Sequence, residues 1–214
     1  MRFSGCTLCA LFSFLLLFSA ANMCAQTADQ NTTVGAASTF KAQRLTSLSA
    51  TNGKDLSPSF LYVGKSISAE VRYNWDDHRV GAACIGKPTG KDSLKLILEA
   101  CGFVGNWNGF GPQVWILSET HRFSLVSYVQ YAKPVDANQM GSQWGQFEGK
   151  LSRWLNLGLG GQAFQVSGSP LAVDLGPAIK LIHKRWDLSA MPMWRTTIQG
   201  RGEKRVYVGL GYEF

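Results

Sequence analysis

The chain has 214 residues, with 21 basic and 14 acidic side chains and a formal net charge of +7. Charged residues make up 16% of the sequence and aromatic residues 12%, which is a low charge content for a soluble protein. The basic residues are spread along the chain and do not gather on one recognition helix, so a nucleic-acid-binding protein is not expected.

Residues 1–25 have the pattern of a secretory signal peptide. Arg2 precedes a short apolar run at 11–18, and small residues follow at both possible cleavage sites, 19–21 and 23–25. The apolar run is too short for the roughly 20 residues of a membrane-spanning helix. A lipoprotein acylated at Cys24 is the alternative. Cleavage after residue 25 leaves 189 residues with 20 basic and 14 acidic side chains, a size that suits one domain.

Residues 26–57 are rich in Thr, Ser, Ala and Asn and show little periodicity. We expect a flexible periplasmic lead-in here, with a short helix at 40–48 as an alternative. The β-barrel domain is expected to occupy residues 58–214.

From residue 58 onwards, apolar and polar residues alternate in short segments separated by turn residues. In the first segment Ile67, Val71 and Tyr73 fall on one face, and Glu70 and Arg72 fall on the other. Segments of about ten residues with this alternation are typical of a transmembrane barrel. The sequence therefore predicts a single antiparallel up-and-down barrel of about ten strands, at residues 66–75, 78–87, 93–102, 111–117, 123–132, 144–155, 156–167, 172–183, 186–196 and 205–214.

The connections between these segments differ in length on the two sides of the predicted barrel. Counting back from the last strand, the longer ones share the outer side and most of the tight ones share the periplasmic side, as expected for a bacterial barrel. The outer set is 105–109, 133–143, 168–171 and 197–204, and the periplasmic set is 88–92, 118–120, the join near 156, and 184–185.

Charged residues gather on one face of the strands. A basic residue facing lipid at mid-bilayer costs about 2–4 kcal/mol, so these residues are expected to line the interior and to pair there. A barrel of this size is mostly filled by side chains, so we expect a narrow or closed lumen. The predicted lumen-lining residues are Glu70, Arg72, Lys95, Glu99, Glu148, Lys150, Asp174, Lys180, Asp187, Arg195, Arg205 and Glu213.

Aromatic residues cluster near the ends of the segments, which fits aromatic girdles at the two membrane interfaces. The residues concerned are Tyr73, Trp75, Trp107, Tyr131, Trp144, Trp154, Trp186, Trp194, Tyr212 and Phe214.

Two cysteines, Cys84 and Cys101, remain after the signal peptide. If the chain turns at 88–92, opposed residues have numbers that sum to about 180, whereas these two sum to 185. The expectation is therefore two small apolar residues, and a disulfide requires a different register.

The sequence offers little sign of catalysis. His78, His121 and His183 all fall at predicted strand ends, and a barrel hydrolase using His121 and Ser124 is a minor alternative because the two residues have opposite parity. Metal-ligand spacing and nucleotide-binding glycine motifs are not found in the sequence. We expect no enzyme activity, no cofactor and no metal.

The last segment reads Arg-Val-Tyr-Val-Gly-Leu-Gly-Tyr-Glu-Phe, with an apolar face that ends in Tyr212 and Phe214. It resembles the closing strand of Gram-negative outer-membrane β-barrels. This resemblance implies that Tyr212 and Phe214 form a C-terminal signal for the barrel-assembly machinery. Residues 62–64 (Tyr-Val-Gly) and 70–74 (Glu-Val-Arg-Tyr-Asn) are similar to small porin-like outer-membrane proteins of unassigned function.

Two functions are expected from these patterns. The first is an outer-membrane barrel, exported through a cleaved signal peptide, that contacts membrane lipid and has a structural or small-solute transport role. The second is a soluble secreted β-barrel that binds a small apolar ligand. Lipocalin-like barrels place apolar residues inside, and the same alternation fits both.

Overall fold

The computed structural model describes residues 43–51, 55–73, 80–91, 93–135, 138–197 and 203–213. The expected signal peptide lies outside these residues. The described chain forms twelve β-strands: β1 (Gln43–Thr51), β2 (Asp55–Val63), β3 (Ser68–Arg72), β4 (Val80–Lys91), β5 (Leu94–Gly105), β6 (Gly109–Glu119), β7 (Phe123–Pro134), β8 (Met140–Lys150), β9 (Leu155–Val166), β10 (Ala172–His183), β11 (Trp186–Thr197) and β12 (Glu203–Glu213). No helix in the described ranges is long and apolar enough to cross a bilayer.

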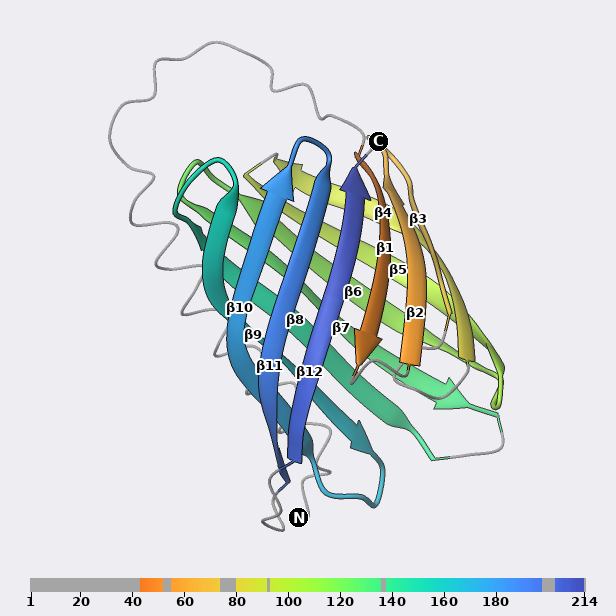
Figure 1. Cartoon of the computed structure of the whole chain (residues 1–214). Coiled ribbons are helices and arrows are strands. Elements are labelled where there is room, and N and C mark those ends of the chain that lie inside the picture. Colours follow the sequence, from red (N-terminus) through yellow and green to blue (C-terminus); the bar gives the residue numbers. More distant parts are fainter. Residues whose placement is uncertain are drawn as a thin grey trace. The chain divides into compact units, whose positions relative to one another are not determined.

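Each strand pairs antiparallel with its neighbours in sequence, and β1 pairs with β12, so the sheet is closed. The closing register runs from Leu45 opposite Glu213 to Thr51 opposite Tyr207. Figure 1 shows β1, in orange, beside β12, in blue. The predicted single up-and-down antiparallel barrel is confirmed.

The barrel has twelve strands where the sequence predicted about ten, because it begins earlier in the chain. Gln43–Thr51 is a strand and lies within residues 26–57, where a flexible lead-in or a short helix was expected. β2 also begins before residue 58. β1 is rich in Ser and Thr, and β2 contains Pro58 and a continuous apolar run at 60–63, so neither shows clear apolar alternation. Their pairing with β12 and β3 defines them instead.

The two faces of the sheet differ sharply in polarity. In β5, Leu94, Leu96 and Leu98 are exposed on the outside, whereas the alternate residues Lys95, Ile97 and Glu99 are buried inside. The same alternation recurs around the barrel, so its outer surface is largely apolar. This agrees with the alternation that the sequence predicted.

Connections alternate between the two ends of the barrel in the predicted way. We call the end at which β12 finishes the C-terminal end; its connections are 64–67, 92–93, 120–122, 151–154 and 184–185. The other end is called the opposite end. Two boundaries need correction: the predicted loop at 133–143 is shorter, because β7 extends to Pro134 and β8 begins at Met140, and the turn placed near residue 156 lies at 151–154.

Cys84 and Cys101 form a disulfide, contrary to expectation. β4 continues through Pro88 to Lys91, so residues of β4 and β5 whose numbers sum to 185 are opposed, and the two cysteines face each other with Cα atoms 4.1 Å apart. The error came from reading Pro88 and Gly90 as a turn, whereas both lie within the strand.

Four of the aromatic residues predicted to form interfacial girdles are exposed near strand ends. Tyr73 and Trp194 lie towards the opposite end, and Trp154 and Trp186 towards the C-terminal end. Trp144 was placed wrongly in this group, because its even-numbered position in β8 faces the interior. Trp75 and Phe214 lie outside the described residues.

One glycine lies where two neighbouring strands approach closely, so we predict that it does not tolerate a larger residue. At Gly158 a Cβ atom would overlap the carbonyl oxygen of Phe147 on β8, so Gly158→Ala must displace backbone. Overpacking of this kind costs about 1–3 kcal/mol. We expect Gly158→Ala to lower the temperature at which the folded barrel loses its compact gel mobility in detergent.

The matched control is Gly102→Ala on β5, where an added Cβ meets no atom within 4 Å. This variant should not lower the temperature at which the folded barrel loses its compact gel mobility. Equal behaviour of the two variants would contradict the register of β8 and β9.

Candidate functional site in the barrel interior

The inward-facing residues of β6 and β7 divide the interior into successive levels. Register pairs them across the two strands, so each pair marks one height in the barrel. From the C-terminal end the pairs are Leu117–Val126, Trp115–Tyr128 and Gln113–Gln130, followed on β7 by Ala132.

A cavity of about 490 Å³ opens at the C-terminal end. Its lining contains six basic and three acidic side chains, a formal charge of +3: Lys95, Lys150, Arg153, Lys180, Lys184 and Arg185 against Glu119, Asp187 and Glu213. Charges of one sign in a recess concentrate counter-ions of the other sign, so the cavity favours anions.

Two of the lysines that line this cavity form ion pairs. Glu148 is fully buried beside it, with Lys180 Nζ 3.2 Å from its Oε2. Asn156 Nδ2 donates to the same carboxylate at 3.0 Å. Lys150 Nζ lies 2.6 Å from Glu119 at the rim.

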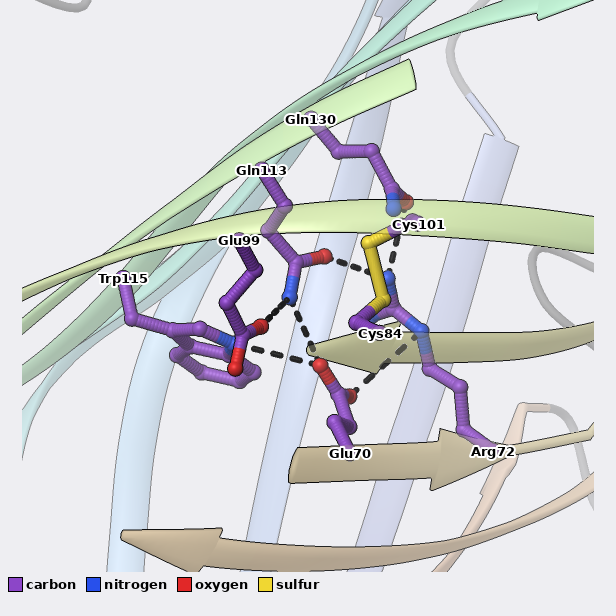
Figure 2. The surroundings of a disulfide bond; sticks show 8 residues. All are labelled: Glu70, Arg72, Cys84, Glu99, Cys101, Gln113, Trp115 and Gln130. Carbon is purple, nitrogen blue, oxygen red and sulfur yellow. Dashed lines mark hydrogen bonds and ion pairs between the residues drawn. A yellow bond between two sulfur atoms is a disulfide. The ribbon is translucent and has the colours of Figure 1, made fainter. Parts of the chain in front are cut away.

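Deeper in the barrel, Arg72 lies at the centre of a buried polar cluster (Figure 2). Its Nη2 donates to the side-chain oxygens of Gln113, at 2.5 Å, and Gln130, at 2.8 Å. Its Nε lies 3.5 Å from Glu70 Oε1. The cluster therefore connects β3 to β6 and β7, and neither of these two strands is adjacent to β3 in the sheet.

Two carboxylates share the remaining donors of this cluster. Gln113 Nε2 donates to Glu70 at 2.6 Å and to Glu99 at 2.9 Å. The Trp115 indole donates to Glu70 at 3.2 Å. Removing one partner from a buried ion pair costs about 3–5 kcal/mol, so this part of the interior is firmly held.

A band of aromatic side chains lies against the polar cluster and crosses the interior. Trp115 contacts Tyr128, whose ring stacks with Trp144 at 6.1 Å between centroids. Trp144 in turn meets Tyr207 at 6.4 Å, although β8 and β12 are separated by three strands. Arg72 lies over the Tyr128 ring at 4.8 Å. Aromatic pairs contribute about 0.5–1.5 kcal/mol each, less than the charged contacts beside them.

The opposite end of the barrel holds an apolar cluster on one side and ion pairs on the other. The apolar cluster includes Phe103, Ala132, Met140 and the disulfide, with Trp107 packed against it. Trp107, predicted to lie at a membrane interface, instead packs on this cluster.

The ion pairs of the opposite end lie on β9 to β12. Arg195 donates to both oxygens of Asp174, at 2.8 and 2.9 Å, and Gln162 donates to the same carboxylate at 2.7 Å. Arg205 Nε lies 3.6 Å from Glu203.

One group of potential metal ligands occurs among the described residues, namely Cys84, Glu99 and Cys101. Both cysteines are consumed by the disulfide, so no thiolate is left to bind a metal. The group therefore offers one carboxylate and not a metal centre.

The structure places the twelve sequence-predicted site residues in three groups. Glu70, Arg72 and Glu99 meet in the polar cluster; Lys95, Glu148, Lys150, Lys180, Asp187 and Glu213 lie at or beside the cavity; Asp174, Arg195 and Arg205 lie towards the opposite end. Sequence reasoning missed Gln113, Gln130, Trp144 and Tyr207, because only charged residues were used to define the inner face. The signal that could have found these residues is their position within each strand, which places them on the inner face.

Fold and interior together define a closed, twelve-stranded up-and-down barrel with an apolar outer face. No protein-family model matches the chain, and no curated protein matches its sequence. Solved structures that align with most of this chain include two porins.

A KdgM porin in complex with disordered oligogalacturonate aligns with a TM-score of 0.52 and 10% identity, covering 80% of this chain and 99% of that one. The NanC porin aligns with a TM-score of 0.55 and 8% identity, covering 80% of this chain and 100% of that one. This chain has the porin-type barrel fold at very low sequence identity.

The contacts of the polar cluster predict that replacing Arg72, its one cation, strongly lowers the stability of the barrel. Arg72→Met leaves two buried carboxylates without their guanidinium, which should lower the free energy of unfolding by about 3–5 kcal/mol. Urea unfolding of the protein refolded into lipid vesicles, followed by tryptophan fluorescence, measures this change.

Lys133→Met provides the comparison, because Lys133 is exposed at the end of β7. It should change the unfolding free energy little. An Arg72→Met protein as stable as Lys133→Met would show that the cluster does not hold the interior.

Proposed function

We propose that this protein is an outer-membrane β-barrel channel for small anionic solutes, with a narrow, charge-lined lumen. The observation that most strongly supports this proposal is the polarity of the barrel: charged and amide side chains are buried inside, and large apolar side chains are exposed outside. An apolar band around a barrel with a polar interior suits a bilayer. A closed sheet also satisfies every backbone hydrogen bond within the membrane.

The same polarity counts against a soluble barrel that holds an apolar ligand. Such a barrel needs apolar residues inside and polar residues outside. Here Glu148 and Asp174 are buried within the barrel, while Leu98 and Leu175 are 63% and 58% exposed on its outside.

Charge in the cavity supports an anionic solute. The cavity has a formal charge of +3, and lysines approach it from β5, β8 and β10. The similar KdgM porin was solved with oligogalacturonate, an anionic sugar oligomer. The proposal for this chain is limited to small anions as a class.

A channel is favoured over a barrel hydrolase by the placement of the histidines. His121 and His183, the two that lie in the described ranges, are both exposed and neither lines the cavity. Ser124 does line it, without a histidine beside it among the described lining residues.

The route to the membrane is part of the same proposal. Residues 1–25 would direct export and be cleaved. Tyr212 packs on Trp186 at 4.6 Å on the outer face and, with Phe214, would be read by the barrel-assembly machinery.

Ion selectivity tests the proposal directly. Arg153 and Arg185 are exposed residues of the cavity rim, so Arg153→Glu with Arg185→Glu changes the formal charge of the cavity from +3 to −1. In planar bilayers under a salt gradient, we expect the wild-type current to be anion-selective. In the double variant the reversal potential should move through zero towards cation selectivity.

Lys133→Glu supplies the control, because it makes the same kind of charge change at the opposite end on the outward face. It should leave the selectivity unchanged. A wild-type protein that folds into bilayers and carries no ionic current, or one that favours cations, would reject the proposed function.

A further inference from the structure

Two neighbouring turns bring three cations together at the C-terminal end of the barrel. The β8–β9 turn contains Arg153, and the β10–β11 turn consists of Lys184 and Arg185. The backbone N–H of Ile182 donates to the carbonyl oxygen of Trp154 at 2.9 Å, so the two turns lie side by side. Both are at the top of the barrel in Figure 1. We call their three cations the turn patch.

The turn patch carries three positive charges that the described chain does not neutralise. Its side chains are exposed, and none of them forms an ion pair or a side-chain hydrogen bond with another described residue. They border the basic cavity on one side and the apolar outer face on the other. The patch is therefore accessible to an anion at the rim of the outer face.

The backbone of Lys184 gives an independent sign that the charge of this turn is used. Its φ is 55°, and it is the one non-glycine residue with a positive φ in the described chain. At the first central position of a two-residue hairpin, glycine or asparagine adopts this conformation at lower cost. A lysine that is kept in an unfavourable conformation on an exposed turn points to a role for its side chain.

Aromatic and then aliphatic side chains follow the cations along the outer face. Trp154 and Trp186, beside the two turns, are 55% and 49% exposed. Leu181 and Leu188, which are paired between β10 and β11, come next towards the middle of the barrel and are exposed as well. Cations, indoles and aliphatic chains in this order match the headgroup, interface and acyl regions of a bilayer leaflet.

The described connections of the opposite end have a different character. Those at 106–108 and 167–171 contain no charged residue. Lys204 lies opposite Trp194 at this end, but the exposed carboxylate of Glu203 is its neighbour in the chain. The turn patch therefore makes the C-terminal end the better surface for an anionic partner.

We propose that the turn patch binds the phosphate headgroup of an anionic phospholipid, with Trp154 and Trp186 beside the glycerol and the acyl chains along the exposed leucines. This proposal rests on the membrane location given in the proposed function and adds a lipid class and its site. A zwitterionic lipid has no net charge, so the three cations do not favour it. An acidic protein outside the membrane would contact the cations and leave the leucines uncovered.

Tryptophan quenching by brominated lipids tests this site on the full-length mature protein. The protein is folded into phosphatidylcholine vesicles that contain a small fraction of brominated phosphatidylglycerol or, in parallel, brominated phosphatidylcholine with the same acyl chains. Bromine quenches the tryptophans that it touches. Wild-type fluorescence should be quenched more by phosphatidylglycerol, and high salt should reduce this excess because it screens exposed charges.

A triple variant removes the charge of the turn patch: Arg153→Gln, Lys184→Asn and Arg185→Gln. Each cation near an anionic surface strengthens binding roughly fivefold, so the affinity for phosphatidylglycerol should fall about a hundredfold. Quenching by the two brominated lipids should then become nearly equal.

The matched control removes three exposed cations from the other side of the same end, with Lys65→Gln, Lys91→Gln and Arg122→Gln. This variant loses the same charge, but its substitutions lie on β2 to β7, away from Trp154 and Trp186. It should keep the wild-type excess of quenching.

Lys184→Asn alone separates the charge of this residue from its backbone conformation. Asparagine adopts a positive φ more readily than lysine, so this variant should resist heat at least as well as the wild type. Its affinity for phosphatidylglycerol should fall roughly fivefold. Reduced heat resistance with unchanged quenching would show a structural role and overturn the use of Lys184 in lipid binding.

The outcomes separate the lipid site from the channel. Equal quenching of the wild type by the two brominated lipids overturns the site, and an anion-selective current from the same protein leaves the channel standing. An equal loss of preference in the control triple variant also overturns the site, since the whole basic end would then attract the lipid. A wild type with the expected preference but no current overturns the channel alone. A protein that does not insert into vesicles overturns both.

Discussion

The pairing of β1 with β12 closes the sheet, and the rest of the structure depends on this closure. An open edge in hydrocarbon would leave a row of unpaired backbone groups, each costing several kcal/mol. Closure also separates an inside from an outside, so that alternate residues of every strand meet different surroundings. The buried charges are tolerable only because of this separation, since the closed wall keeps them away from the apolar outer face and brings their partners within reach.

The balance of positive and negative side chains inside the barrel changes from one end to the other. At the C-terminal end cations outnumber anions and leave a basic cavity, whereas at the opposite end carboxylates and guanidinium groups are matched, as in the Asp174–Arg195 pair. Between them lies a polar cluster around Arg72 and the aromatic band that continues from it. A solute entering from the cavity would therefore leave an attractive recess and meet the buried polar cluster and the aromatic band.

Much of the fold could be predicted from the sequence, because a period of two in β5 or β11 directly reports which side chains face outward. The first two strands could not, because β1 is rich in Ser and Thr like a linker and β2 lacks a clear alternation, so only long-range pairing identifies them. The disulfide was missed for a related reason: Pro88 and Gly90 are strong turn residues locally, and the register of β4 against β5 overrides them.

Charged site residues were found from parity alone, but their partners were not. Gln113 links two carboxylates and Arg72 across strands that are far apart in the chain, and no local pattern reports such a contact. The sequence around Trp144 is compatible with a position at a membrane interface as well as with one in the barrel interior. Its contact with Tyr207 follows from the curvature of the closed sheet.

Membrane fractionation combined with gel mobility tests the central claim, which is that the apolar outer face of this closed barrel sits in the outer membrane. The account predicts native protein in the outer-membrane fraction, released only by detergent, and migrating differently before and after boiling because the closed barrel resists unfolding. Protein recovered in the soluble fraction without detergent, with the same mobility heated or unheated, would contradict the account.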